Sequence, residues 1–248
     1  MLIELPCGVH HNKTIYDKVI VKALTGRQQN YLIDMELVAG NIGHIPKLLE
    51  DLTVQFQTTE GLPLDMAHKD AIWKLPTEDI EFILVKIREE TFGPNFALPT
   101  SCPHCGKQQM KKIELDKIES RKLPDKAVRT KVIQLPKSGK EAEIKLMYLK
   151  DMFTLFKNFS EKKSELYTAT VALTVKRIGD KEDITNDDLL DLPATDIKLI
   201  EDAYSEIHAE VDIKIINDCE NPDCGKEYEV VLPVTDASFF AQSTTPLT

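Results

Sequence analysis

Four of the five cysteines fall into two pairs, and their spacing constrains the fold more than any other feature of the sequence. Cys102 and Cys105 are separated by two residues, and Cys219 and Cys224 by four. Both spacings suit zinc-binding hairpins, because a tight turn between two thiols aims both sulfur atoms at one ion. Gly-Lys follows each pair, and the glycine gives the chain freedom to reverse. The pattern predicts one structural zinc per chain, bound by Cys102, Cys105, Cys219 and Cys224.

Strand-like sequence lies on both sides of the second pair, so two hairpins facing each other are expected to form a zinc ribbon. Four thiolates leave no open position for water or substrate, which favours a structural ion over a catalytic one. A thioredoxin-like redox pair and a labile metal site are the alternatives. Cys7, His10 and His11 form a weaker group that could bind metal, but no matching half is nearby. A buried thiol with surface imidazoles is the favoured interpretation of these three residues.

The two cysteine pairs belong to an internal repeat. Leu75–Ile80 corresponds to Leu192–Ile197 at an offset of 117 residues, and the same offset places Cys102 on Cys219. Both matching segments begin a helix with a proline near the first turn and acidic residues at the positive end of the helix dipole. A common helix start that recurs by chance is the alternative. The shared order of helix start, cysteine and Cys-Gly-Lys favours duplication.

These patterns predict an α+β fold with two duplicated helix-plus-hairpin halves joined by a discontinuous four-cysteine zinc ribbon. Residues 1–118 are expected to form the N-terminal half with the first zinc knuckle, 119–235 the C-terminal half with the second, and 236–248 a C-terminal tail. The polar segment 116–130 is the expected linker. The long separation of the pairs is no obstacle to a shared ion, because closure entropy grows slowly with loop length.

Hydrophobic periodicity and turn signals predict the individual elements. Residues 137–140, Lys-Ser-Gly-Lys, are expected to form the turn of a hairpin. The predicted helices span residues 26–38, 45–58, 65–74, 78–91, 150–158, 161–176, 185–191 and 195–208, and the predicted strands span 17–24, 107–114, 130–135, 141–149, 211–217 and 226–232.

Charge and hydropathy disfavour several classes of protein. The chain has 41 acidic and 31 basic residues, a net charge of −10, which disfavours nucleic-acid binding and suits solubility or a basic protein partner. No apolar run reaches the roughly 18 residues of a membrane span, and the N-terminus lacks the pattern of a secretory signal. In a reducing compartment such as the cytoplasm, Cys-x-x-Cys pairs favour metal or redox chemistry over disulfides.

Motifs that would indicate catalysis are not found in the sequence. It contains no glycine-rich phosphate loop, nucleophile elbow or His-Glu-x-x-His. The acidic runs at 89–90 and 187–191 are spaced like solvated helix faces, and Trp73 is expected in the core. We therefore expect a protein that is not an enzyme, with no catalytic or cofactor-binding residues beyond the zinc ligands and no small-molecule substrate.

A series of motifs extends in order over most of the chain. It contains Leu-Pro-Thr-Glu-Asp at Leu75, Ile-Arg-Glu-Glu-Thr-Phe-Gly at Ile87–Gly93, Cys-Pro-His-Cys-Gly at Cys102, and a late Cys-Gly-Lys followed by an apolar strand and two phenylalanines. Together these motifs resemble the baseplate hub and tail-assembly family of T-even-type contractile-tail bacteriophages. The segment Lys22–Arg27 is similar to sequence motifs near the start of phage tail-assembly proteins.

The resemblance implies a virion baseplate or tail-assembly protein that is made in the host cytoplasm. It would join hub, tube, spike or wedge subunits, or chaperone their assembly, with other phage tail or baseplate proteins as its partners. A rigid adaptor binds with little reorganisation, and contacts are expected on the ribbon surface and at Phe239–Thr248, although the two phenylalanines could equally pack on their own domain. The alternative function is a cytosolic zinc-ribbon module in nucleic-acid machinery, which the acidic second hairpin disfavours.

Overall fold

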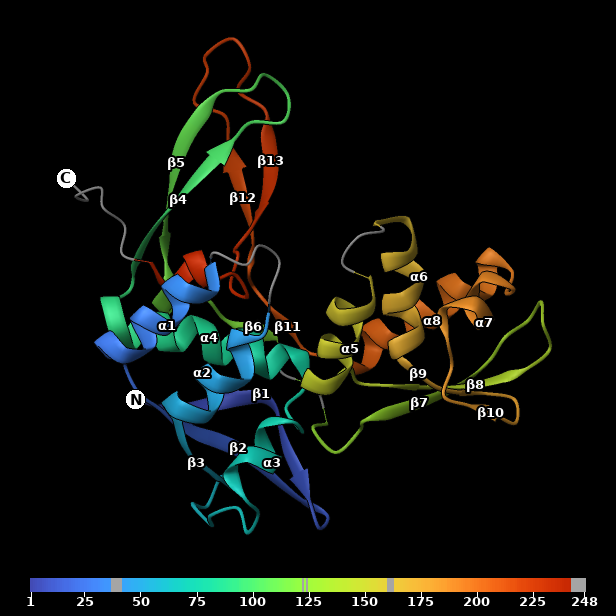
Figure 1. The fold of residues 1–248 in the computed structure, drawn as a ribbon. Helices are drawn as coiled ribbons and strands as arrows, with labels where there is room; N and C mark the ends of the chain where they lie inside the picture. The colour runs from blue at the N-terminus through green and yellow to red at the C-terminus, as the bar shows by residue number, and fades with distance from the viewer. Residues whose placement is uncertain (37–41, 122, 124, 160–162, 242–248) are drawn as a thin grey trace.

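The computed structural model describes residues 1–36, 42–121, 123, 125–159 and 163–241. It is a mixed α/β structure with two bodies side by side and an arm that projects from the first of them (Figure 1). Each body has its own cluster of buried apolar side chains. Among the described residues, no helix has the length and apolarity needed to cross a membrane.

The N-terminal body contains a three-stranded antiparallel sheet in the order β1-β2-β3. Its strands are β1 (Leu2–His11), β2 (Thr14–Val21) and β3 (Thr53–Gln57), and its helices are α1 (Gly26–Glu36), α2 (His44–Leu52), α3 (His68–Ile72) and α4 (Thr77–Phe92). The predicted apolar face of α4 is confirmed, because Ile80, Ile83, Leu84 and Ile87 are fully buried. Phe82 and Val85 are also buried, so α4 is enclosed on most sides, as expected for a central helix.

The second body contains a four-stranded antiparallel sheet in the order β10-β9-β8-β7. Its strands are β7 (Thr130–Gln134), β8 (Glu141–Lys145), β9 (Val175–Ile178) and β10 (Lys181–Glu182), and its helices are α5 (Leu149–Phe159), α6 (Lys163–Leu173), α7 (Asn186–Leu190) and α8 (Ala194–Ile207). The predicted hairpin between β7 and β8 is confirmed.

The arm contains two hairpins that lie about one hundred residues apart in the sequence and side by side in space (Figure 1). One is formed by β4 (Asn95–Ser101) and β5 (Gln108–Glu114), the other by β12 (Lys214–Asp218) and β13 (Glu227–Val231). Short elements connect the arm to the bodies: η1 (Leu115–Lys117), η2 (Ala237–Phe240), and β6 (Ser120–Arg121), which pairs with β11 (Glu210–Val211).

The two parts of the chain show the same order of elements. The first part runs through two strands, two helices, a strand, a short helix, a long helix and a hairpin, from β1 to β5. The second part repeats this order from β7 to β13, with the two-residue strands β10 and β11 added. In each part the second strand lies at the centre of the first three.

A pair of aspartates occupies the same position in the two long helices. Asp79, the third residue of α4, accepts hydrogen bonds from the backbone N–H groups of Cys7 (2.8 Å) and Gly8 (2.7 Å). Asp196, the third residue of α8, accepts them from Lys137 (3.1 Å) and Ser138 (2.8 Å). Each carboxylate therefore ties the start of a long helix to the first hairpin of its own body.

Several elements differ from the sequence prediction. The helix predicted at 45–58 ends at Leu52, because β-branched Thr53 and Val54 continue as β3. The helix predicted at 161–176 is described as α6 only to Leu173, and β9 follows it. Strand β1 was not predicted, since it contains Pro6, which sheets tolerate at bulges. Its ladder is irregular between Glu4 and Val9.

Gly8 makes this irregularity possible. Its φ is +79°, and an added Cβ would lie 2.9 Å from the Asp17 Cα, so only glycine fits without displacing the neighbouring strand.

The last described element, η2, packs on the N-terminal body. Phe239 and Phe240 are 0% and 2% exposed, and both belong to the first apolar cluster. Phe239 lies edge-on to Phe96, with ring centroids 5.1 Å apart. Arg88, 2% exposed, lies over Phe92, Phe96 and Phe239 at 4.6–5.7 Å, a cation–π arrangement. Partner contacts were expected at Phe239–Thr248. Within this segment, Phe239 and Phe240 are buried in the N-terminal core of the same chain, and residues 242–248 lie outside the described residues.

Candidate metal centre

The four cysteines predicted as zinc ligands meet at the far end of the arm. Their sulfur atoms all lie within 4.8 Å of one another. Cys102 Sγ is 3.9 Å from Cys224 Sγ, and Cys105 Sγ is 3.5 Å from Cys219 Sγ. Disulfide sulfurs are about 2.05 Å apart, whereas tetrahedral ligands at a Zn–S distance of about 2.3 Å are about 3.8 Å apart. The arrangement therefore fits a shared metal ion.

In both hairpins the backbone N–H of the first cysteine donates to the carbonyl of the lysine that follows the glycine. The N–H of Cys102 donates to the carbonyl of Lys107 (2.9 Å), and the N–H of Gly106 donates to the backbone carbonyl of Cys102 (2.8 Å). In the second hairpin, Cys219 donates to the carbonyl of Lys226 (3.0 Å). Gly106 and Gly225 have φ of +75° and +52°, in the left-handed region that glycine adopts without strain. The sequence expectation for these glycines is thus confirmed.

The thiols differ in how readily they lose a proton. A hydrogen bond from the backbone of Lys107 lowers the pKa of Cys105 to about 7. At Cys219 the N–H of Asn221, 3.5 Å from Sγ, acts to lower the pKa, but burial and the three neighbouring thiols together raise it to about 12. Cysteine binds a metal ion as the thiolate. An ion bound here would therefore displace the proton from thiols with a raised pKa, such as Cys219.

One family of known proteins matches almost the whole chain. A family model described as T4 bacteriophage base plate protein matches residues 15–241. The chain belongs to this family. No curated protein and no solved structure matches it. Membership confirms the resemblance inferred from the sequence motifs, and it implies a structural protein of the phage tail whose partners are other tail proteins.

In this baseplate protein, a group of polar side chains below the cysteines joins the two hairpins. Asn217 Nδ2 donates to Tyr228 OH (2.7 Å) within the second hairpin, and Tyr228 OH lies 2.9 Å from Thr100 Oγ1 in the first. Gln109 of β5 donates to the carbonyl of Asp218 (2.7 Å) and accepts from the N–H of Glu220 (2.9 Å). We call these four residues, Thr100, Gln109, Asn217 and Tyr228, the polar clamp.

Sequence reasoning missed the polar clamp. All four residues are buried, although three of the four are residue types that usually lie at the surface. Two polar residues, Thr100 and Gln109, flank the first knuckle, and Asn217 precedes the second at the same offset of 117 residues from Thr100. The repeat of a polar residue at this position was the one sequence signal that could have indicated the polar clamp.

We expect Tyr228→Phe to weaken the arm. The substitution removes the hydroxyl that links Asn217 to Thr100 and leaves buried polar atoms without a partner, at a cost of about 1–2 kcal/mol. Chelator titration at fixed zinc, followed by metal analysis, should show weaker metal retention than in the wild type. Tyr31→Phe, in α1 and far along the chain from both hairpins, is the matched control and should retain metal normally. Unchanged retention in Tyr228→Phe would contradict a role of the polar clamp in holding the hairpins together.

Cys7, His10 and His11, the weaker candidate group for metal binding, lie outside the four-cysteine cluster. Cys7 is fully buried, and burial followed by the charge of Asp79 raises its pKa. His10 Nε2 accepts a hydrogen bond from Arg129 Nε (3.0 Å), and burial with the Arg129 charge lowers the His10 pKa to about 4. The preferred interpretation of Cys7 as a buried thiol is confirmed, while His10 is half-buried and joins the two bodies.

Buried acidic residues lie where the bodies meet. Glu78, 5% exposed, accepts a hydrogen bond from Tyr204 OH of α8 (3.1 Å). Backbone contacts lie beside it: Thr77 N–H donates to the Met147 carbonyl (3.0 Å), and Leu149 N–H donates to the Leu75 carbonyl (3.1 Å). Burial raises the pKa of Glu78 to about 7.

The folded state should therefore lose stability as pH rises, because it prefers the neutral form of Glu78. The contribution is present below about pH 4.3, the pKa expected of an unfolded glutamate, and is lost as pH rises through about 7. Glu78→Gln keeps a neutral acceptor for Tyr204, so we expect its free energy of unfolding to exceed that of the wild type by about 3–4 kcal/mol at pH 8 and to match it near pH 4. Urea unfolding across this range measures the difference, with exposed Glu60→Gln as the control for net charge. A pH-independent difference would contradict the raised pKa.

Proposed function

We propose that the chain is a non-enzymatic adaptor of the contractile-tail baseplate, made rigid by one zinc ion bound to Cys102, Cys105, Cys219 and Cys224. The observation that carries this proposal is the convergence of four thiols from two hairpins on one point. Residues 106–218 separate the two pairs, so an ion here cross-links the chain across the whole second body. Four thiolates saturate a tetrahedral zinc, which suits a structural staple.

The duplication is part of the same proposal, with halves at 1–118 and 119–235 and a tail at 236–248. The repeated order of elements supports it, as does the matching role of Asp79 and Asp196 at an offset of 117 residues. In this view each half contributes one knuckle to a discontinuous zinc ribbon. Each hairpin is a two-stranded sheet of its own, and because the two lie side by side in the arm, one ion could serve both halves.

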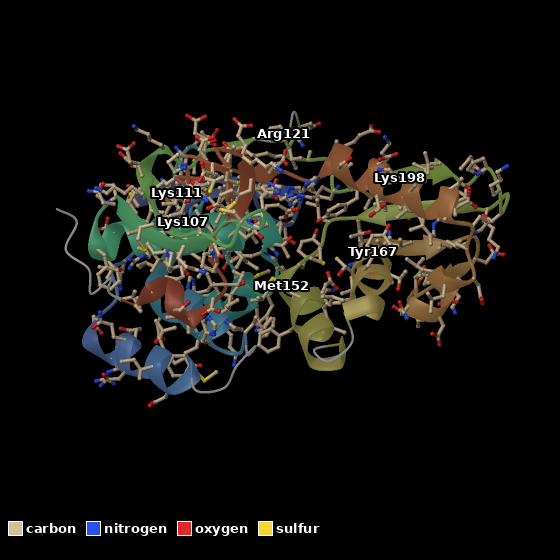
Figure 2. The ribbon with its side chains drawn as sticks, turned by 90° about the horizontal axis from the view of Figure 1, so that it is seen from above. Lys107, Lys111, Arg121, Met152, Tyr167 and Lys198 are labelled. Atoms are coloured by element: carbon tan, nitrogen blue, oxygen red, sulfur yellow. The ribbon has the colours of Figure 1, made fainter. Side chains whose placement is uncertain are left out.

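The surfaces of such an adaptor should carry its function. The arm stands away from both bodies, and Figure 2 shows Lys107 and Lys111 on it above the N-terminal body, with Tyr167 and Lys198 on the second body. On the outer side of the second hairpin, Ile216 and Val231 are 58% and 52% exposed. Exposed apolar residues on a stiff ribbon suit contacts with hub, tube, spike or wedge subunits.

Co-expression tests the adaptor role. The chain should copurify with at least one hub, tube, spike or wedge protein encoded in the same phage genome, and Cys219→Ser should reduce the yield of the complex at least fivefold. Cys7→Ala is the matched control, because Cys7 lies outside the four-cysteine cluster. If the chain binds none of these proteins but is retained on DNA or RNA in a salt-sensitive manner, the nucleic-acid alternative is correct and the adaptor proposal is wrong.

A further inference from the structure

A pocket of about 620 Å³ lies between the two bodies and has no cysteine in its walls. Trp73 and Lys74, which follow α3, line it from the N-terminal body. Arg129, Tyr148 and Lys150, which flank β7 and begin α5, line it from the other side. Its volume lies within the range of ligand sites in proteins. Figure 2 shows Met152, two residues beyond Lys150, at this junction of the bodies.

Two half-buried aromatic side chains supply the apolar surface of the pocket. Trp73 packs against the N-terminal core and meets Phe153 edge-on, with ring centroids 5.5 Å apart. Tyr148 packs against the second core, and its backbone pairs with Pro76 in an isolated β-bridge. Both rings are therefore held by their own body, and rigid aromatic rings are frequent anchors for a partner's side chains.

The polar part of the pocket is positively charged. Lys74, Arg129 and Lys150 line it against one carboxylate, Asp70. Neither lysine forms an ion pair with any residue in the described part of the chain. The Arg129 guanidinium is fixed, since its Nη2 donates to the carbonyls of Cys7 (2.7 Å) and Gly8 (2.9 Å). Three cations thus gather around one pocket of a chain whose net charge is −10, which selects an anionic ligand.

We propose that this pocket binds a short segment of a partner protein that presents a carboxylate beside an aromatic or aliphatic side chain. The carboxylate lies against Lys74, Arg129 and Lys150, where charge-assisted hydrogen bonds are strongest, and the apolar side chain lies against Trp73 and Tyr148. A nucleic-acid backbone is the poorer fit, because it needs a longer track of cations than one pocket offers. Since the walls belong to both bodies, the bound segment also holds the bodies in one orientation.

Because Trp73 is the sole tryptophan of the chain, its fluorescence reports directly on ligand binding in the pocket. The emission of Trp73 in the full-length, zinc-containing protein is followed while acetyl-Glu-Phe-Asp-Leu-amide is added. We expect a saturable shift, and an affinity at least tenfold weaker for the uncharged peptide acetyl-Gln-Phe-Asn-Leu-amide. No shift with the acidic peptide at millimolar concentration, or equal affinity for the two peptides, overturns the proposal.

Charge reversal locates the binding in this pocket. Lys74→Glu with Lys150→Glu should weaken binding of the acidic peptide at least tenfold. Lys22→Glu with Lys140→Glu is the matched control, because it reverses one exposed lysine from each half and changes the net charge equally. Both variants should give the circular dichroism spectrum of the wild type. Equal loss of binding in the two double variants, or binding of a short oligothymidine as tight as that of the peptide, overturns the proposal.

The identity of the partner as a tail protein rests on the proposed function, whereas the peptide titration does not. If the chain copurifies with baseplate subunits but the acidic peptide does not bind, the pocket inference is wrong and the adaptor proposal stands. If the peptide binds at the pocket but no tail protein copurifies, the adaptor proposal is wrong and the pocket stands.

Discussion

Protein produced without added metal should contain about one zinc per chain, and Cys219→Ser should contain none. Three thiolates bind zinc far more weakly than four, and the lost one comes from the pair 3.5 Å apart, Cys105 and Cys219. Atomic absorption on the purified chain measures the metal content. Cys7→Ala, which alters the cysteine outside the cluster, should keep its zinc. Stoichiometric disulfides without metal would show that the cluster is a redox site.

Removing the ion should open the outer part of the arm first. Phe96 and Ile113, at its base, belong to the N-terminal core, whereas the outer cluster contains only Cys102, Cys219 and Tyr228 as buried members. Hydrogen exchange after chelation should therefore lose protection near both knuckles, while β1, β2, β7 and β8 remain protected because each body retains its own core. Simultaneous loss of protection in all strands would mean that zinc stabilises the whole chain.

Asp79→Ala should destabilise the protein by about 3–5 kcal/mol at pH 7.5. The side chain is fully buried, and its loss leaves the N–H groups of Cys7 and Gly8 without acceptors, each at a cost of about 1–3 kcal/mol. Burial raises the pKa of Asp79 to about 6, so the carboxylate is mostly ionised at this pH. Urea unfolding of both variants measures the difference in free energy.

The corresponding substitution in the second body supplies the comparison. Asp196 is also fully buried, but the turn that it holds, at Lys137 and Ser138, is partly exposed, and water can replace the lost acceptor. We therefore expect Asp196→Ala to cost about 1–2 kcal/mol. A loss below about 1 kcal/mol for Asp79→Ala would contradict the view that these carboxylates hold helix to hairpin.

Much of the candidate site follows from local sequence. The cysteine spacing, the glycine after each pair and the strand-like flanks of the second pair encode the knuckles, because a tight turn needs only its own residues. The start of α4 and the buried face of that helix were also predicted, since proline, acidic residues and a period of 3.6 are local signals. The offset of 117 residues relates Asp79 to Asp196 as well as Cys102 to Cys219, and both aspartates are the third residue of their helices.

Other features were decided by contacts between distant residues. Strand β1 contains a proline and a bulge, so its place in a sheet depends on β2 and on Gly8 approaching Asp17. The helix predicted through residue 58 ended early because Thr53 and Phe56 are buried as part of the sheet. The β-branched Thr53 also favours a strand, so local propensity and burial act in the same direction here.

The sequence by itself determined that four thiols would converge, that strands would follow the first pair and flank the second, and, through its motifs, the family of the chain. Strand β4, which leads to Cys102, was not predicted. Only the tertiary structure decided that the base of the second hairpin packs on the N-terminal core, that Phe239 and Phe240 close this core, and that cations gather around Trp73. The reason is physical: turns and helix starts depend on neighbours in the chain, whereas burial, the gathering of cations and the polar clamp depend on residues that only the folded chain brings together.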